Sequence, residues 1–226
     1  MRFLMQVMLL AAMGAAGVVN GQAGADSSAY VAVINQLAGD VIYEAAGAAP
    51  AAKARAFMRA RHGDRYLIPA GASLRILYLS NARQETWRGP ATLRVMGVGS
   101  SEAISGRPFE VATLPVAVSQ KMSHLPDMVQ GARLGGVTVR GGGGGGRPPG
   151  SVPAEVREAQ AMYKVLRSQS STDDVTPELY LLSVLQEFGY SDEMGPVADE
   201  IFRRQPNSPD ARELALWAKS WAYAAR

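Results

Sequence analysis

The spacing of hydrophobic residues differs between the two halves of this 226-residue chain. Between residues 28 and 140, short runs rich in β-branched and aromatic residues alternate with turn signals such as Gly63-Asp64 and Pro69-Ala70-Gly71. Short strands separated by turns at this spacing are typical of antiparallel sandwiches and barrels. We therefore predict an antiparallel β sandwich or barrel-like domain over residues 28–140.

Individual strands can be assigned within this stretch. Residues 30–36 and 41–43 flank the turn signal Leu37–Asp40, which predicts a hairpin. Further strands are expected at residues 57–60, 65–68, 73–79, 84–87 and 91–96. Residues 114–118 fit one more strand. The pattern leaves residues 101–140 open, because Gly131–Arg140, with Val137–Val139, fits either a closing strand or the start of a tail.

From Pro153 the hydrophobic period becomes helical. Thr176-Pro177 and Ser208-Pro209 each supply a capping hydroxyl followed by proline, a combination typical of helix starts. Gly189 ends one apolar stripe, as glycine commonly does beyond a helix. The expected fold class is therefore α+β in separate domains, with a small antiparallel helical bundle over residues 153–226.

Six consecutive glycines, Gly141–Gly146, separate the two halves and are followed by Arg147-Pro148-Pro149-Gly150. A glycine run cannot hold one backbone conformation without a large entropic cost, so residues 141–152 are interpreted as a flexible linker. A phosphate-binding loop would require Lys-Ser or Lys-Thr after the glycines, and Arg147-Pro148 does not supply it.

The N-terminus has the three parts of a secretory signal peptide. A positive start at Arg2 precedes the mostly apolar run Phe3–Val19, and Ala23-Gly24-Ala25 forms a small-residue cleavage site. Cleavage is expected after Ala25, with cleavage after Ala23 as the alternative. Residues 1–25 are therefore predicted to be a signal peptide, the mature protein to be periplasmic or secreted, and no transmembrane segment to remain after cleavage.

Two resemblances add to this interpretation. The order of Gly63-Asp64, Leu67–Ala72, Leu74–Leu79 and Trp87–Val95 resembles a FecR-type periplasmic β domain over about residues 30–100. This resemblance implies a small, exported, non-enzymatic β module. The anti-sigma role of FecR proteins is not expected to carry over, because this sequence pattern does not predict a cytoplasmic domain before the apolar segment. About residues 153–226 are similar to a tetratricopeptide (TPR) repeat, although only about one and a half units are present.

The amino-acid composition excludes several kinds of functional site. The chain has no cysteine, which removes disulfides, thiolate metal sites and cysteine nucleophiles. Residues 26–140 carry 13 basic and 8 acidic residues, and residues 141–226 carry 9 and 12, so neither half is basic enough to predict nucleic-acid binding. His62 and His124 lack a second ligand at metal-binding spacing. We therefore expect no catalytic, cofactor or metal residues.

Two aromatic clusters are the candidate binding residues. Arginine beside tryptophan can stack or grip an anion, which singles out Arg83, Trp87 and Arg88. Trp217 and Trp221 share one helix face and could meet a partner. For both clusters, burial in the core is the favoured alternative.

These observations favour a non-enzymatic envelope protein that binds or scaffolds other envelope components. The expected partner is an envelope protein, and an anionic or glycan ligand is a further alternative. The second hypothesis is a ligand-sensing accessory of an envelope signalling system, as the FecR resemblance implies. The third is an unrecognised hydrolase.

Overall fold

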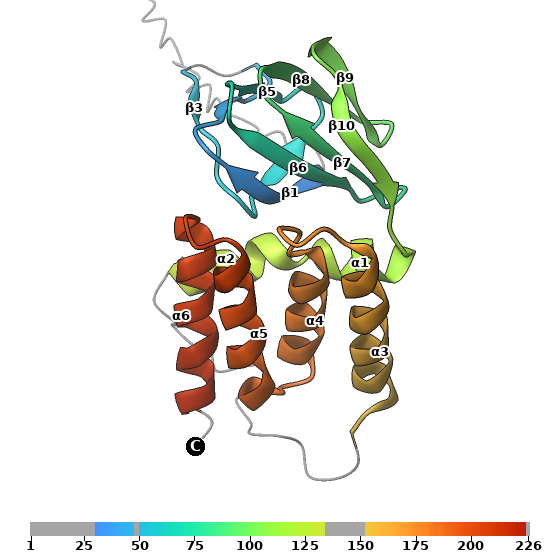
Figure 1. The fold of residues 1–226 in the computed structure, drawn as a ribbon, viewed down its shortest axis with the longest axis vertical. Coiled ribbons are helices and arrows are strands. Elements are labelled where there is room, and N and C mark those ends of the chain that lie inside the picture. The colour runs from blue at the N-terminus through green and yellow to red at the C-terminus, as the bar shows by residue number, and fades with distance from the viewer. Residues whose placement is uncertain (1–29, 48–49, 134–151, 225–226) are drawn as a thin grey trace, which may run out of the picture.

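A computed structural model describes residues 30–47, 50–133 and 152–224 of the chain. The predicted signal peptide and the six-glycine run of the predicted linker lie outside these described residues. Strands occupy the N-terminal part and helices the C-terminal part (Figure 1).

Within the described residues, the strands form two antiparallel sheets of five strands each. Sheet A has the order β10-β7-β6-β1-β4, and sheet B the order β3-β2-β5-β8-β9. The strands of sheet A are β1 (Tyr30–Ala38), β4 (Arg59–Arg61), β6 (Ser73–Tyr78), β7 (Arg83–Arg88) and β10 (Pro108–Thr113). Those of sheet B are β2 (Ile42–Glu44), β3 (Ala52–Lys53), β5 (Arg65–Ile68), β8 (Ala91–Met96) and β9 (Ser100–Ser105).

The two sheets enclose a hydrophobic core. Every second residue of β6, namely Leu74, Ile76 and Tyr78, is buried in this core. Tyr66 of β5 and Leu93 of β8 lie in the same core from sheet B. This arrangement follows from strand geometry, because successive side chains of a strand point to opposite faces of the sheet.

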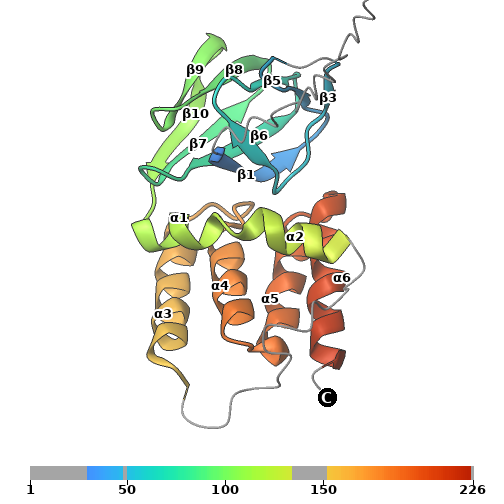
Figure 2. The same ribbon diagram turned by 180° about the vertical axis from the view of Figure 1, so that it is seen from behind.

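The helices lie below sheet A in the orientation of Figure 1. They are α1 (Val116–Met122), α2 (Leu125–Arg133), α3 (Ala154–Gln169), α4 (Thr176–Glu187), α5 (Ser191–Arg204) and α6 (Pro209–Ala224). Helices α3 to α6 stand side by side in chain order, and α1 and α2 run across them near the sheets (Figures 1 and 2). Two of the predicted helix boundaries are confirmed. At the start of α6, Ser208 Oγ accepts a hydrogen bond from Ala211 N at 3.2 Å, and beyond the end of α4, Gly189 has a φ of 73°.

Sheet A is therefore covered on both faces. Val33 of β1 and Leu77 of β6 belong to the same hydrophobic cluster as Met122 of α1 and Leu179 of α4. This explains why residues 73–79 are apolar at almost every position: β6 is a central strand buried on two sides, rather than on one. The molecule thus has three layers, in the order sheet B, sheet A, helices.

Polar side chains join sheet A to the loop before α4. Arg75 of β6 forms an ion pair with Asp174 at 2.8 Å, and both side chains are buried. The Thr176 hydroxyl donates to Gln84 of β7 at 3.2 Å, and Asn35 Nδ2 donates to Thr176 at 2.9 Å. The expected capping role of Thr176 is therefore wrong: its hydroxyl is directed to sheet A, while Asp174 accepts from Thr176 N at 2.8 Å.

A second contact joins the other end of the helical layer to the strands. The Asp210 carboxylate in the first turn of α6 accepts from Arg55 Nη2 at 2.9 Å and from Ala56 N at 2.9 Å. Phe57, the next residue, is buried in the cluster shared with the helices. Both ends of the helical row are thus attached to the sheet layer.

The predicted hairpin of residues 30–36 with 41–43 is wrong. β1 pairs with β4 and β6 in sheet A, whereas β2 pairs with β3 and β5 in sheet B. Gly39, with a φ of 77°, lies in the segment where the chain passes from one sheet to the other. The physical reason is that β1 is buried on both faces and therefore takes a place inside sheet A.

Residues 114–118 were expected as a strand, and this prediction is also wrong, because Val116–Met122 is helical. A short apolar run fits a strand and a buried helix equally well. The spacing of Val118, Met122 and Leu125, all buried, is helical. Strands β9 and β10 form within the stretch that the sequence left open, and residues 137–139 lie outside the described residues.

The expected α+β composition, with strands first and helices after, is confirmed at this level. Closure into a barrel is not seen in the described part of the chain, where the strands form two separate sheets. None of the described helices is both long enough and apolar enough to span a membrane.

Candidate functional site

The outer face of sheet B points away from the rest of the molecule. Tyr66 and Ile68 of β5 point into the sandwich core, so Arg65 and Leu67 point outward. The register places further side chains on this face. We define the outer face of sheet B as Ile42, Glu44, Arg65, Leu67, Thr92, Arg94 and Glu102.

A charged row crosses this face over four strands. Glu44 is the register partner of Arg65, Arg65 of Arg94, and Arg94 of Glu102. Glu44 and Arg65 form an ion pair at 3.4 Å, and Arg94 and Glu102 one at 2.9 Å. The row therefore has two arginines in the middle and one glutamate at each end.

An apolar row runs beside the charged one. Ile42 and Leu67 are register partners, and Leu67 in turn lies opposite Thr92. Ile42 is 38% and Leu67 is 44% exposed. A surface with exposed apolar side chains next to charged ones has the composition of a recognition surface, because apolar contact supplies affinity and charge supplies specificity.

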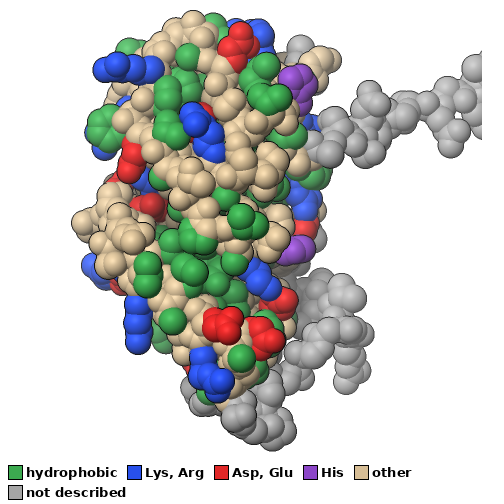
Figure 3. Space-filling model, turned by 90° about the vertical axis from the view of Figure 1, so that its right-hand side faces the viewer, with side chains coloured by type: hydrophobic (Ala, Val, Ile, Leu, Met, Phe, Trp, Pro, Cys, Tyr) green, Lys and Arg blue, Asp and Glu red, His purple; other side chains and the backbone are tan. Residues whose placement is uncertain are grey.

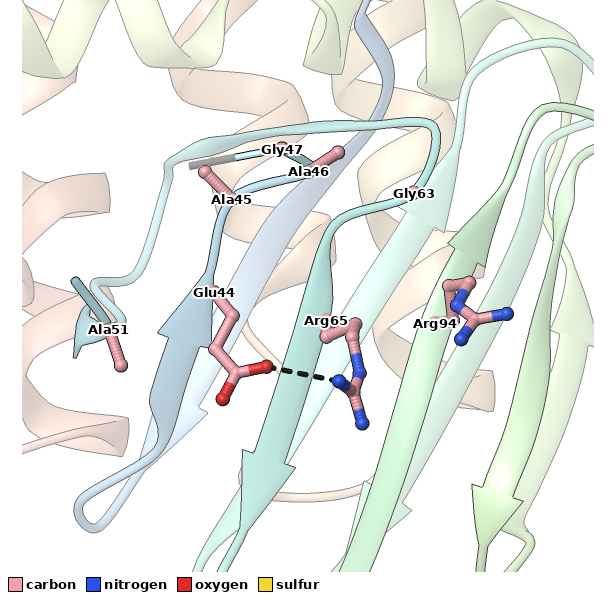
Figure 4. A pocket seen from close by; sticks show the side chains of 8 residues that line it. All are labelled: Glu44, Ala45, Ala46, Gly47, Ala51, Gly63, Arg65 and Arg94. Atoms are coloured by element: carbon pink, nitrogen blue, oxygen red, sulfur yellow. Dashed lines mark ion pairs between the residues drawn. The ribbon is translucent and has the colours of Figure 1, made fainter. Parts of the chain in front are cut away.

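A hollow of about 620 Å³ adjoins the charged row. It is lined by Glu44, Ala45, Ala46, Gly47, Ala51, Gly63, Arg65 and Arg94 (Figure 4). Figure 4 shows the 45–47 segment and Gly63 along one side of it, with the arginine and glutamate side chains on the strands below.

The buried carboxylate of Asp64 fixes one rim of the hollow. It accepts from Ala46 N at 3.0 Å, from Arg61 N at 2.8 Å and from the Tyr43 hydroxyl at 3.2 Å. Burial, together with the Asp64 charge, raises the pKa of Tyr43 to about 12, so the phenol stays protonated and donates. The Gly63-Asp64 turn signal in the sequence thus has a structural role beside the hollow.

The structure places Trp87 in the sandwich core rather than on a surface. Its exposed fraction is 1%, and its indole Nε1 donates to Glu85 Oε2 at 3.1 Å. Arg83 Nε donates to Glu85 Oε1 at 2.7 Å, while the Arg88 guanidinium lies 3.5 Å from the centre of the exposed Phe109 ring. The three predicted residues therefore lie on one strand but do not form a single exposed cluster.

Trp217 and Trp221 do lie together on α6. Their rings are 5.8 Å apart in an edge-to-face arrangement, and Trp217 is buried in the cluster shared by the helices and sheet A. Trp221 packs against the same cluster and is partly buried. This pair contributes to the packing of the last helix.

A second apolar area lies on the side of β10, α1 and α3. Figure 3 shows hydrophobic side chains gathered across the middle of this face. The exposed members on these elements are Phe109, Val111, Val116 and Val165.

His62 and Asp173 have structural partners. His62 Nδ1 accepts from Gly97 N at 2.8 Å, and Asp173 accepts from Gln36 Nε2 at 3.5 Å. Among the described residues, no group of three or more histidine and acidic side chains could hold a metal ion.

Sequence reasoning missed Glu44, Arg65, Arg94 and Glu102. The available signal was the alternation in Arg65–Ile68 and in Ala91–Met96, which places an arginine outward on each strand. Only the strand order makes these two arginines neighbours, since β5 and β8 are separated by two strands of sheet A in the sequence.

Comparisons with family models, with curated proteins and with solved structures found no match to this chain.

Proposed function

We propose that this chain is an exported, non-enzymatic binding protein of the cell envelope, which contacts its partner through the outer face of sheet B. The observation that carries the proposal is the layer order. Among the described residues, sheet A is covered on both faces by other elements, whereas sheet B is covered on one face only.

The side chains on that face support a binding role. Ile42 and Leu67 are exposed neighbours, and the charged row lies parallel to them. The FecR resemblance of the strands and the TPR-like spacing of the helices point to the same class of modular, non-catalytic protein. In this proposal the helices form a TPR-like support that holds sheet A, and the export signal places the whole body in the periplasm or outside the cell.

The test is crosslinked capture from envelope extract with the exported chain. Ile42→Ser with Leu67→Ser should lower the yield of a specific protein partner by about tenfold or more, the size of effect that follows from losing about 1.4 kcal/mol of binding free energy. Both positions are exposed, so the variant should remain folded, which circular dichroism checks.

The matched control is Val116→Ser with Val165→Ser, which changes two exposed valines on the area of β10, α1 and α3. This control should capture the partner as the wild type does. Loss of the partner in the control alone, or a wild-type chain that captures nothing specific, would contradict the proposal.

A further inference from the structure

The hollow beside the outer face of sheet B has the size of a small-molecule site. Its volume of about 620 Å³ falls within the range of about 300–1,000 Å³ that is usual for ligand pockets. Three alanines and two glycines form much of its lining, so the side chains there are small and non-polar. The functional groups that reach it are the side chains of Glu44, Arg65 and Arg94 (Figure 4).

The two arginines are placed at an electrostatic cost. Arg65 and Arg94 are register partners on adjacent strands, and like charges directly opposite each other destabilise a sheet. Among the described residues, Glu44 forms an ion pair with Arg65 and Glu102 forms one with Arg94, each from the side away from the other arginine. A negative group between the arginines would relieve the repulsion from the inner side as well.

Both guanidinium groups retain donors for such a group. Arginine has five N–H donors. Arg94 uses Nη1 for Glu102, and Arg65 approaches Glu44 at 3.4 Å without a hydrogen bond in the described part of the chain. The two arginine side chains are 44% and 42% exposed, and exposed ion pairs are worth about 0–1 kcal/mol, so a ligand can compete with the glutamates.

The charge of the row selects among anions. Two arginines and two glutamates sum to zero, so a phosphate dianion would leave the site strongly negative, and a lone carboxylate would leave it negative by one. A zwitterion leaves it neutral. Its carboxylate can bind the arginines in a bidentate manner, and its ammonium group can donate to Glu44.

We propose that this hollow binds a small amino-acid-like zwitterion, such as a free amino acid or a dipeptide. Arg65 and Arg94 hold the carboxylate, Glu44 accepts from the ammonium group, and the alanine walls contact the aliphatic part. The proposal rests on the proposed function, because it gives the binding face its small-molecule ligand.

The test is a calorimetric titration of the full exported chain with alanylalanine. N-acetyl-alanylalanine lacks the ammonium group, alanylalanine amide lacks the carboxylate, and inorganic phosphate serves as the dianion. Alanylalanine should bind most tightly. Arg65→Gln and Arg94→Gln should each weaken it by about tenfold or more, which corresponds to about 1.4 kcal/mol. Glu44→Gln should weaken alanylalanine but not its N-acetyl form.

Arg88→Gln is the matched control, since Arg88 lies on β7 against Phe109 and away from the hollow. It should bind alanylalanine as the wild type does. Absence of saturable binding, tighter binding of phosphate than of alanylalanine, or unchanged affinity in the Arg65 and Arg94 variants would overturn the inference. Partner capture through Ile42 and Leu67 is measured separately, so a negative titration with capture intact rejects the ligand alone.

Discussion

At the scale of single residues, the structure assigns several conspicuous side chains to support rather than to recognition. Trp87 is the clearest example, because its ring is buried between the sheets and its indole Nε1 donates a hydrogen bond to the buried Glu85. The residues proposed for recognition, Arg65 and Arg94, look ordinary in the sequence. Their importance comes from neighbours that are distant along the chain.

Replacing Asp64 should destabilise the segment around Ala46 and Arg61 that its carboxylate holds. The Asp64 carboxylate accepts hydrogen bonds from Ala46 N and Arg61 N. In Asp64→Asn, the NH₂ group of the new amide would face one of these N–H donors, which would lose its acceptor. We expect the free energy of unfolding to fall by about 1–3 kcal/mol, the range for buried polar groups that are left unsatisfied. Urea unfolding measures it.

Asp40→Asn provides the comparison, because Asp40 is exposed and pairs with the exposed Lys53. Its effect should stay within about 1 kcal/mol. Equal effects of the two substitutions would show that Asp64 does not hold the rim of the hollow.

At the scale of elements, the loop between α3 and α4 is the main polar connection between the helices and sheet A. Removing the Arg75 side chain by Arg75→Met leaves the buried Asp174 without its cation. Breaking one partner of a buried ion pair typically costs about 3–5 kcal/mol. Urea unfolding should therefore show a large loss of stability, whereas Arg203→Met, which removes an exposed arginine paired with Glu200, should change stability much less.

A double-mutant cycle separates the ion pair from general packing. Combining Arg75→Met with Asp174→Asn should cost clearly less than the sum of the two single changes, since the second substitution removes the charge that the first left unpaired. Strict additivity would mean that the two side chains do not interact in solution.

Acidification should weaken the attachment of the loop between α3 and α4 to sheet A, because Asp173 of this loop accepts from Gln36 of β1. Burial raises the pKa of this carboxyl, but hydrogen bonds from Ser171, Gln36 and its own backbone, with the charge of Arg75, outweigh burial and hold the pKa below the usual value. A depressed pKa stabilises the folded state above the usual aspartate range, and that contribution is lost as the pH falls through the folded-state pKa.

The wild type should therefore be more stable than Asp173→Asn at neutral pH, and this difference should shrink as the pH is lowered toward and below the usual aspartate range. Urea unfolding of both proteins across this range measures the difference. A difference that stays constant with pH would show that Asp173 does not titrate as described.

The elements themselves were largely predictable from the sequence, and their partners were not. The strands at residues 65–68, 73–78 and 91–96 and the helix boundaries near Gly189 and Ser208 follow from local signals. The pairing of β1 with β6 instead of β2 could not be predicted, because it depends on burial of β1 between two layers. The helical run after Leu114 was missed because its apolar spacing is short and ambiguous.

At the scale of the whole molecule, the layer order connects the fold to the proposed function. Helices cover one face of sheet A and sheet B covers the other, and no helix or strand of the described ranges covers the outer face of sheet B. The candidate site could not be predicted because it depends on this order: the same arginines on a covered face would be part of a structural network, as Arg75 is.

The absence of native cysteine allows one measurement to test this layer order and the binding face together. Single cysteines are placed at Val33, between sheet A and the helices, at Leu67 on the outer face of sheet B, and at Val165 on α3. Thiol labelling rates are then measured with and without envelope extract.

We expect the cysteine at position 33 to label very slowly, and those at positions 67 and 165 to label fast. Envelope extract should slow labelling at position 67 and leave position 165 unchanged. Fast labelling at position 33 in the folded protein, or slowing by the extract at position 165 alone, would contradict this expectation.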